Sequence, residues 1–237
     1  MYEQEKERLK RQTTYTIDDL RLIVSILRSP EGCPWDREQT HKSIIPGMIE
    51  ESYEVVEAIE CDSTEMLREE LGDVLLQIVF HADIERECGN FDFDDAVTDI
   101  CRKMIVRHPH VFADVTADTA DVVLENWDQI KAKTKSQKNL SEKLDSIAKP
   151  LPALVRTQKV IRKTAKEREV PHPDVSSRLS ETERCLGDAF ADVIRLCEAE
   201  GVEAETVLRR YCDALIEKIK QSSSPSIRRE IFFADGL

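Results

Sequence analysis

The sequence predicts an all-α protein, and three observations support this prediction. The 237 residues include only seven glycines, which suits helices better than sheets with many tight turns. Charged residues make up 34% of the chain and recur every few positions between apolar ones, as in amphipathic helices. Segments that contain prolines, such as 29–34 and 150–152, separate these periodic stretches. The length allows one large or two small domains, and we expect two modest units.

The first three helices are predicted from apolar spacing and from stop signals. A helix over 17–27 ends at 29–34, where two prolines and a glycine prevent its continuation. A second helix begins near Pro46, which a first turn tolerates, and runs to about Glu60. We expect Asp62 to cap a third helix, which Gly89-Asn90 ends.

The later part of the chain also reads as helices joined by polar segments. A fourth helix fits 94–107 and stops at His108-Pro109, and a fifth, short helix fits 121–133. The stretch 133–152 is polar and closes with Pro150-Leu151-Pro152. Three more helices are predicted, at 153–167, 180–200 and 204–221.

The two halves of the chain are interpreted as diverged copies. Leu71-Gly72-Asp73 recurs as Leu186-Gly187-Asp188, and each copy lies in a helix that a second amphipathic helix follows. The predicted organisation is a charged lead at 1–14, a first domain at 15–136, a linker at 137–152, a second domain at 153–222 and a tail at 223–237.

Charge and composition exclude several classes of function. The net charge of -13 argues against binding to nucleic-acid backbone or to an anionic membrane surface. No apolar run approaches the length of a bilayer span, and residues 1–11 lack the apolar core of a signal peptide. Seven cysteines without a CxxC pair suggest neither a disulfide framework nor a zinc knuckle. We therefore expect a soluble cytoplasmic protein with no membrane or nucleic-acid partner.

Five carboxylates on the second and third predicted helices are the candidate chemical groups. Glu50, Glu51 and Glu54 project along one edge of the apolar arc of their helix, and Glu70 and Asp73 repeat that spacing one helix later. A glutamate-rich helix is most often a solvated face, and for the first group alone that reading stands. The second pair weakens it, because this pair lies in a helix that is otherwise apolar.

The third helix is predicted to be buried, because apolar side chains cover nearly all of its directions. One polar stripe remains, made of Glu70, Asp73, Gln77 and His81. Burying several carboxylates is costly unless cations compensate their charge. Oxygen ligands without a thiol or paired histidines favour Mg²⁺, with Mn²⁺ as a substitute, over zinc.

These segments resemble a known family. Glu50-Glu51-Ser52-Tyr53-Glu54 followed by Glu70-Leu71-Gly72-Asp73 resembles the EExxE…ExxD signature of the MazG-type nucleoside triphosphate pyrophosphohydrolases. Three more segments resemble the family in the expected order: Gly32-Cys33-Pro34-Trp35-Asp36, Arg107-His108-Pro109-His110-Val111-Phe112 and Trp127-Asp128-Gln129-Ile130-Lys131.

The resemblance implies a fold, a reaction and a metal site. The fold would be tandem MazG-like helical bundles of about four helices each, assembled as a homodimer. The reaction would be hydrolysis of NTPs or dNTPs between the α- and β-phosphates, giving a nucleoside monophosphate and pyrophosphate. Four carboxylates would hold the metal, namely Glu51, Glu54, Glu70 and Asp73. Glu50 would be a further ligand or a water-orienting base.

The resemblance also implies substrate contacts. Four side chains match family positions that contact phosphates, namely Lys103, Arg107, Trp127 and Lys131. For the first two, ordinary surface charge is the alternative. Trp35 and Asp36 would meet the base or sugar, although an aromatic residue that pins its loop to the core is an equal alternative for Trp35.

The second half departs from the family pattern. Cys185 stands where the glutamate of ExxD is expected, and no EExxE precedes it across 171–180. We expect the metal site in the first domain only, and a packing or dimerisation role for the second.

One rival function remains, and a second is set aside. The first is a catalytically inactive nucleotide-binding or interaction protein, which the degraded second copy suggests. The second is a di-iron site, which needs two ExxH motifs on facing helices. Here one such motif, ending at His41, lies near a loop, and the other, ending at His172, contains a proline.

Overall fold

The computed structural model describes part of the chain, namely residues 2–113, 119, 123, 130, 139–165 and 178–222. Among these residues every regular element is a helix, so the all-α prediction is confirmed. The chain divides into two compact units, Met1–Trp127 and Asp128–Leu237. No helix in the described part of the chain has the length and apolar content to cross a membrane.

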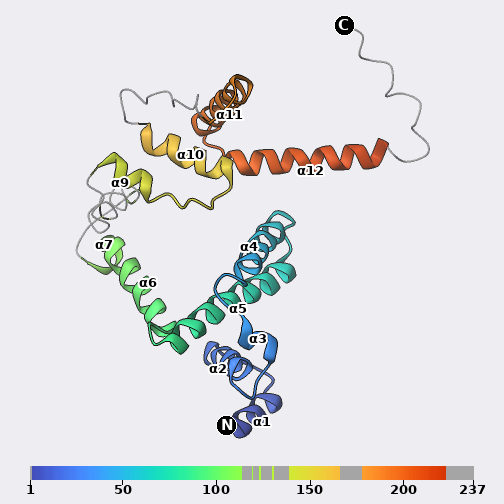
Figure 1. Cartoon of the computed structure of the whole chain (residues 1–237), viewed down its shortest axis with the longest axis vertical. Helices are drawn as coiled ribbons and strands as arrows, with labels where there is room; N and C mark the ends of the chain where they lie inside the picture. The colour runs from blue at the N-terminus through green and yellow to red at the C-terminus, as the bar shows by residue number, and fades with distance from the viewer. Residues whose placement is uncertain are drawn as a thin grey trace. The chain divides into compact units, whose positions relative to one another are not determined.

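Unit 1 is coloured from blue to green in Figure 1, and its described helices are α1 (Glu3–Arg11), α2 (Ile17–Arg28), α3 (Pro34–Glu38), α4 (Ile45–Glu60), α5 (Thr64–Cys88), α6 (Phe93–Arg107) and α7 (Pro109–Phe112). The described helices of unit 2 are α9 (Leu140–Asp145), α10 (Ala153–Thr164), α11 (Glu181–Ala199) and α12 (Ala204–Ser222). The segment expected as a linker at 137–152 contains α9, and the helix predicted at 121–133 lies almost wholly outside the described residues.

Three short helices occupy segments that were expected to be irregular. The charged lead contains α1, and α3 and α7 form inside the two proline-containing loops. Both α3 and α7 begin at a proline, whose fixed φ angle suits a first helical turn. The prolines therefore end one helix and start the next.

Helices α4 and α5 lie side by side as a tight hairpin (Figure 1). The prediction that Asp62 caps α5 is wrong. Asp62 adopts a left-handed conformation with φ of 51°, and the following residue, Ser63, is the N-cap, whose side chain accepts a hydrogen bond from the backbone N–H of Met66 at 3.3 Å. The left-handed residue reverses the chain sharply, so the capping position moves one residue along. The predicted stop at Gly89 is confirmed, with φ of 72°.

The core of unit 1 lies where α2 and the start of α4 meet the second half of α5. Its buried residues are Val24, Ile44, Val79, Phe80 and Ile84, and Leu20, Leu76 and Phe93 pack against them. The first half of α5 extends beyond this core, and among the described helices α4 lies beside it.

A buried arginine ties α2 to both α3 and α5. The Arg28 side chain donates hydrogen bonds to the Glu87 carboxylate at 2.6 Å and to the Asp36 carbonyl at 2.8 Å. It also lies 3.4 Å from the Asp83 carboxylate and over the Phe80 ring. Since these partners come from two elements, Arg28 fixes α3 against α5.

A buried glutamine organises unit 2. Gln158 of α10 is 1% exposed, and its side chain donates to the Val202 carbonyl at 2.8 Å and to Glu198 at 3.1 Å. It accepts from the backbone N–H of Ala204 at 2.8 Å. One side chain thus satisfies the polar groups of the turn between α11 and α12.

Candidate metal and nucleotide site

Three carboxylates from α4 and α5 converge in unit 1. Glu51, Glu70 and Asp73 each offer an oxygen, and these oxygens all lie within 4.8 Å of one another. All three side chains are half-buried. Among the described residues this is the group of side chains arranged to hold a metal ion.

The hairpin explains why these carboxylates meet. Because α4 and α5 run in opposite directions from the tight turn at Cys61–Ser63, Glu54 faces Glu70 and Glu51 faces Asp73, one turn further from the connection. The carboxylates that lie three residues apart on each helix therefore form two pairs across the hairpin, Glu54 with Glu70 and Glu51 with Asp73.

The carboxylates make one another harder to ionise. Burial raises the pKa of Glu51, and a hydrogen bond with Glu54 and the charge of Asp73 raise it further. Burial also raises the pKa of Glu70, with the charge of Glu54 and a hydrogen bond to it as the next causes. Like charges held this closely create a negative potential that a cation would relieve.

Glu50 lies at the margin of this group. It is exposed on α4, and its charge contributes to the raised pKa of Glu51. It does not belong to the set of three whose oxygens converge.

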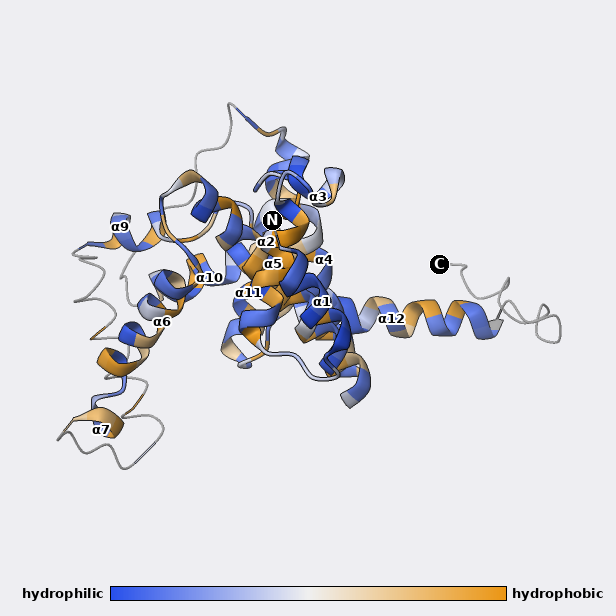
Figure 2. Cartoon of the chain, turned by 90° about the horizontal axis from the view of Figure 1, so that it is seen from below, coloured by the Kyte–Doolittle hydropathy of each residue, from blue (hydrophilic) through white to orange (hydrophobic). Residues whose placement is uncertain are grey.

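The prediction that α5 is buried is right for Val79 and Phe80 but wrong for several apolar residues before them. Leu71 and Ile78 are 51% and 41% exposed, and Ile49 and Tyr53 of α4 are exposed beside them. Among the described helices, α4 packs along the first half of α5, and these apolar side chains on its other faces remain exposed. Apolar residues also alternate with polar ones along α6 and α12, as the hydropathy colours of Figure 2 show.

The basic residues expected at the phosphates lie on α6, away from the carboxylates. Figure 1 shows α6 turning away from the α4–α5 pair after the end of α5. Lys103 is exposed and Arg107 is buried near the end of α6. One chain therefore does not bring these two side chains to the carboxylates. Trp127 and Lys131 lie outside the described residues.

The aromatic residue of the expected base site is available to a ligand. Trp35 in α3 is 66% exposed, so in the single chain it does not pin its loop to the core. Arg28 holds the carbonyl of neighbouring Asp36 instead. The loop is anchored through its backbone, and the indole stays free to stack.

A pair of histidines extends the polar stripe of α5, and the sequence analysis did not predict that the two side chains meet. His41, in the loop before α4, lies with its Nδ1 2.7 Å from Nδ1 of His81 and its Nε2 2.6 Å from Glu85. Asn90 donates to the other oxygen of Glu85 at 2.7 Å. The spacing of four residues between Gln77, His81 and Glu85 was the available signal, but nothing in the sequence indicates that His41 folds onto it.

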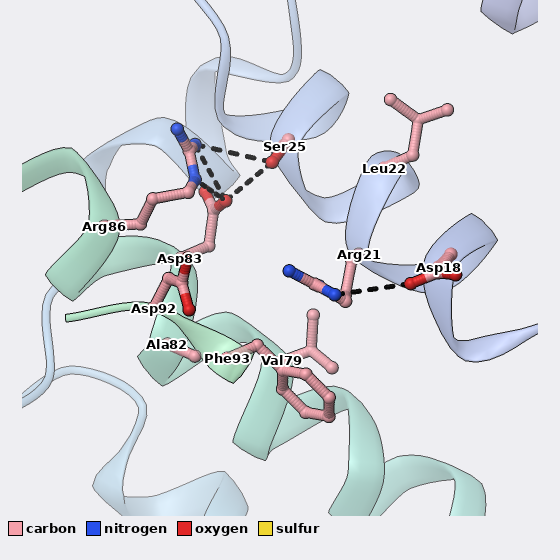
Figure 3. Close-up of a pocket in the computed structure, with 10 residues that line it drawn as sticks. All are labelled: Asp18, Arg21, Leu22, Ser25, Val79, Ala82, Asp83, Arg86, Asp92 and Phe93. Atoms are coloured by element: carbon pink, nitrogen blue, oxygen red, sulfur yellow. Dashed lines mark hydrogen bonds and ion pairs between the residues drawn. The ribbon is translucent and has the colours of Figure 1, made fainter. Parts of the chain in front are cut away.

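Unit 1 also contains a cavity of about 320 Å³ between α2, α5 and the start of α6 (Figure 3). Its charged groups are already paired: Arg86 donates to Asp83 at 2.9 Å, and Arg21 binds both oxygens of Asp94 at 2.9 Å. Ser25 also donates to Asp83, at 2.6 Å. Because these arginines neutralise aspartates, the cavity offers no unpaired arginine to a phosphate, and none of the predicted site residues lines it.

Comparison with known proteins decides the family. The family model described as the MazG nucleotide pyrophosphohydrolase domain matches residues 39–112. A Thermotoga maritima protein named nucleoside triphosphate pyrophosphohydrolase/pyrophosphatase MazG is 35% identical over 93% of this chain and 88% of its own length. The chain belongs to the MazG family. The resemblance of the EExxE and ExxD segments to that family is thereby confirmed.

Two further relatives match shorter stretches of this MazG-family chain. The Escherichia coli (strain K12) nucleoside triphosphate pyrophosphohydrolase is 48% identical over 63% of the chain, and the Bacillus subtilis uncharacterized protein YabN is 50% identical over 59%. The chain spans 57% of the length of the first and 28% of the second. The match of the family model contains the carboxylate group and the histidine pair, and it ends at Phe112.

Proposed function

We propose that this protein hydrolyses nucleoside triphosphates to nucleoside monophosphates and pyrophosphate, with Mg²⁺, at the carboxylate group of unit 1. The observation that carries the proposal is the convergence of oxygens from Glu51, Glu70 and Asp73 within 4.8 Å. The names of the Thermotoga maritima and Escherichia coli relatives support the same reaction.

The donor set fits a hard divalent cation. Carboxylate oxygens are the ligands that Mg²⁺ and Mn²⁺ prefer, and Mg²⁺ usually combines a few of them with substrate phosphates. Glu51, Glu70 and Asp73 would hold the ion, and Glu54 would complete the set opposite Glu70. When bound, Mg²⁺ would neutralise phosphate charge and make attack at phosphorus easier.

The chain's own side chains would perform the remaining tasks. Glu50, exposed beside the cluster, would orient a water molecule and accept its proton. Trp35 would stack on the base, and Asp36 would hydrogen-bond the sugar or base. Four side chains would bind phosphate oxygens, namely Lys103, Arg107, Trp127 and Lys131.

A second copy of the chain would complete the site. Leu71 and Ile78 of α5 and Ile49 of α4 leave an apolar face uncovered beside the carboxylates, while Lys103 lies on a helix that turns away from them. A homodimer would cover that face and would let α6 of one protomer reach the carboxylates of its partner.

Product identification tests the reaction. The purified chain with Mg²⁺ and a panel of NTPs and dNTPs should release pyrophosphate and a nucleoside monophosphate, and EDTA should stop the reaction. Glu51→Gln and Glu54→Gln should abolish it. Glu57→Gln, on an exposed position one turn further along α4, is the matched control and should keep full activity. Orthophosphate as the direct product would contradict the mechanism. Metal-dependent nucleotide binding without turnover would support the inactive nucleotide-binding alternative.

Mixing of variants tests the shared site. Asp73→Asn and Lys103→Ala chains should each be inactive, and a mixture of the two, refolded or exchanged together, should recover activity through mixed dimers. A monomer in light scattering, or no recovery in a mixture shown to contain mixed dimers, would exclude a site shared between copies.

A further inference from the structure

The carboxylates are one end of a polar seam that runs along the contact between α4 and α5. Beyond Asp73, the next residue on the polar stripe of α5 is Gln77. Its side chain lies against Gly47 of α4, where a Cβ atom added to the glycine would lie 2.8 Å from the Gln77 amide nitrogen. Glycine therefore leaves room for the glutamine side chain between the helices. One turn further, His81 meets His41.

The seam has the dimensions of a nucleotide site. His81 is eight residues from Asp73, which places it about 12 Å further along α5 at about 1.5 Å per residue. That separation is comparable with the length of a nucleoside. The exposed Trp35 lies six residues before His41 in the same segment. Between them, the Gln39 side chain donates a hydrogen bond to the Trp35 carbonyl at 2.9 Å.

The hydrogen bonds of the histidine pair set the proton positions. The hydrogen bonds from Asn90 and His41 lower the pKa of Glu85, so this carboxylate is ionised and only accepts. His41 must then carry a proton on the Nε2 that lies 2.6 Å from it. Burial and the neighbouring His41 lower the pKa of His81, so His81 is neutral and has a single N–H.

One nitrogen of His81 remains available. Its Nδ1 is occupied by His41, and no described residue forms a hydrogen bond with its Nε2. When His41 is neutral, its Nδ1 accepts from Nδ1–H of His81, which leaves Nε2 of His81 as an acceptor. The contacts of His41 with Glu85 and His81 therefore determine whether Nε2 of His81 accepts or donates a hydrogen bond.

We propose that Nε2 of His81 hydrogen-bonds the base of the bound nucleotide, and that His41 and Glu85 are positioning residues that fix its donor or acceptor character. The inference rests on the proposed function and identifies the part of the site that distinguishes one base from another. Gln77, between the two ends of the seam, would face the sugar.

Binding measurements on the full chain test this proposal without requiring turnover. The probes are α,β-methylene analogues of ATP, GTP, CTP and UTP with Mg²⁺, and pyrophosphate with Mg²⁺ as a probe that lacks the nucleoside. His81→Phe should weaken binding of the preferred analogue about tenfold, the scale of one hydrogen bond, and leave pyrophosphate binding unchanged. His110→Phe is the matched control, because His110 lies in α7 and its ring contacts His108 rather than the seam.

Conservative variants separate positioning from packing. Glu85→Gln keeps the shape of the side chain but allows His41 to bind in either tautomer, and His81→Gln keeps a polar group that can flip. Both should retain affinity for the best analogue within about threefold and reduce the discrimination between the cytosine and uracil analogues, which present an amino group or a carbonyl at the same position.

The outcomes are distinct. Equal weakening of pyrophosphate and nucleotide binding in His81→Phe would assign the histidine pair a purely structural role and overturn the proposal, as would unchanged base discrimination in both conservative variants. Nucleotide binding without turnover in the wild type would contradict the proposed function. The base-binding role would still be judged by the change in nucleotide binding relative to pyrophosphate binding and by the discrimination between bases. Absence of binding by every probe would overturn both.

Discussion

The helix pairs of the two units use their polar residues in opposite ways. Between α4 and α5 of unit 1, Glu54 faces Glu70 and Glu51 faces Asp73, and the pKa values of Glu51 and Glu70 are raised. Between α10 and the α11–α12 turn of unit 2, Gln158 forms three hydrogen bonds inside the protein.

The ion pairs of unit 2 also differ from the carboxylate group of unit 1. Arg162 binds Glu198 at 2.7 Å and Glu203 at 3.0 Å. These partners raise the pKa of Arg162 and lower that of Glu198, so both groups stay charged. These polar groups of unit 2 pair with one another, whereas in the described part of the chain no ion pair compensates Glu51, Glu70 or Asp73 of unit 1. Such a stored electrostatic cost is typical of a functional site.

The largest expected difference lies between the two copies of the Leu-Gly-Asp sequence. Asp73→Asn should lower kcat by about 10²- to 10³-fold, because it removes a charged ligand from the catalytic group. Asp188→Asn, at the corresponding place in α11, should leave kcat per folded molecule within about twofold. Steady-state pyrophosphate release measures both, and equal losses in the two variants would show that the units are not specialised as described.

Removing the central amide of unit 2 should cost stability rather than activity. Gln158→Leu leaves the backbone N–H of Ala204 and the Val202 carbonyl without partners, at a cost of about 2–4 kcal/mol. Hydrogen exchange of peptides from α10 and α12 measures it locally. Lys159→Gln, on the adjacent exposed position, is the control. Unchanged protection in the leucine variant would mean that the turn does not depend on Gln158.

Mg²⁺ should stabilise unit 1, and more so at higher pH. Because burial raises the folded-state pKa of Glu51 and Glu70, ionisation costs metal-free stability as the pH rises through these raised values. Protons and Mg²⁺ compete for the same oxygens, so Mg²⁺ binding strengthens over that interval. At about 100 times its Kd, Mg²⁺ contributes about 2.7 kcal/mol, or roughly 5–10 °C in Tm.

Thermal unfolding at pH 5.5 and pH 8, with EDTA or with Mg²⁺, measures this effect. The gain at pH 5.5 should be less than half of the gain at pH 8. Glu51→Gln should raise the Tm in EDTA, since it removes one of the repelling charges, and should lose most of the gain from Mg²⁺. A gain that is independent of pH would place the bound ion elsewhere.

The smallest effect is expected at the ion pair of unit 2. The Arg162 side chain is half-exposed, so solvent screens its bonds, and Arg162→Gln should destabilise the unit by only about 0.5–1 kcal/mol. The loss should shrink further in 1 M salt. A loss as large as that of Gln158→Leu would contradict the view that the buried amide, rather than the ion pair, holds the turn.

The local signals of this chain were sufficient for most helices. Gly89 ends α5 as predicted, because only glycine adopts its backbone conformation without strain, and the apolar spacing located α2, α4 and α6. The cap at Ser63 was missed because the left-handed Asp62 depends on how α4 and α5 close their hairpin. The exposure of Leu71 was also missed, since periodicity shows that a face is apolar but not what covers it.

The sequence by itself determined the all-α class and placed Glu51, Glu70 and Asp73 on adjacent helices, because period and caps are local properties of the chain. Only the tertiary structure decided that their oxygens lie within 4.8 Å and that His41 folds onto His81. It also placed Lys103 on a helix that turns away from the carboxylates. These facts depend on the register of the hairpin and on the path of the loop before α4, which arise from packing between segments far apart in sequence.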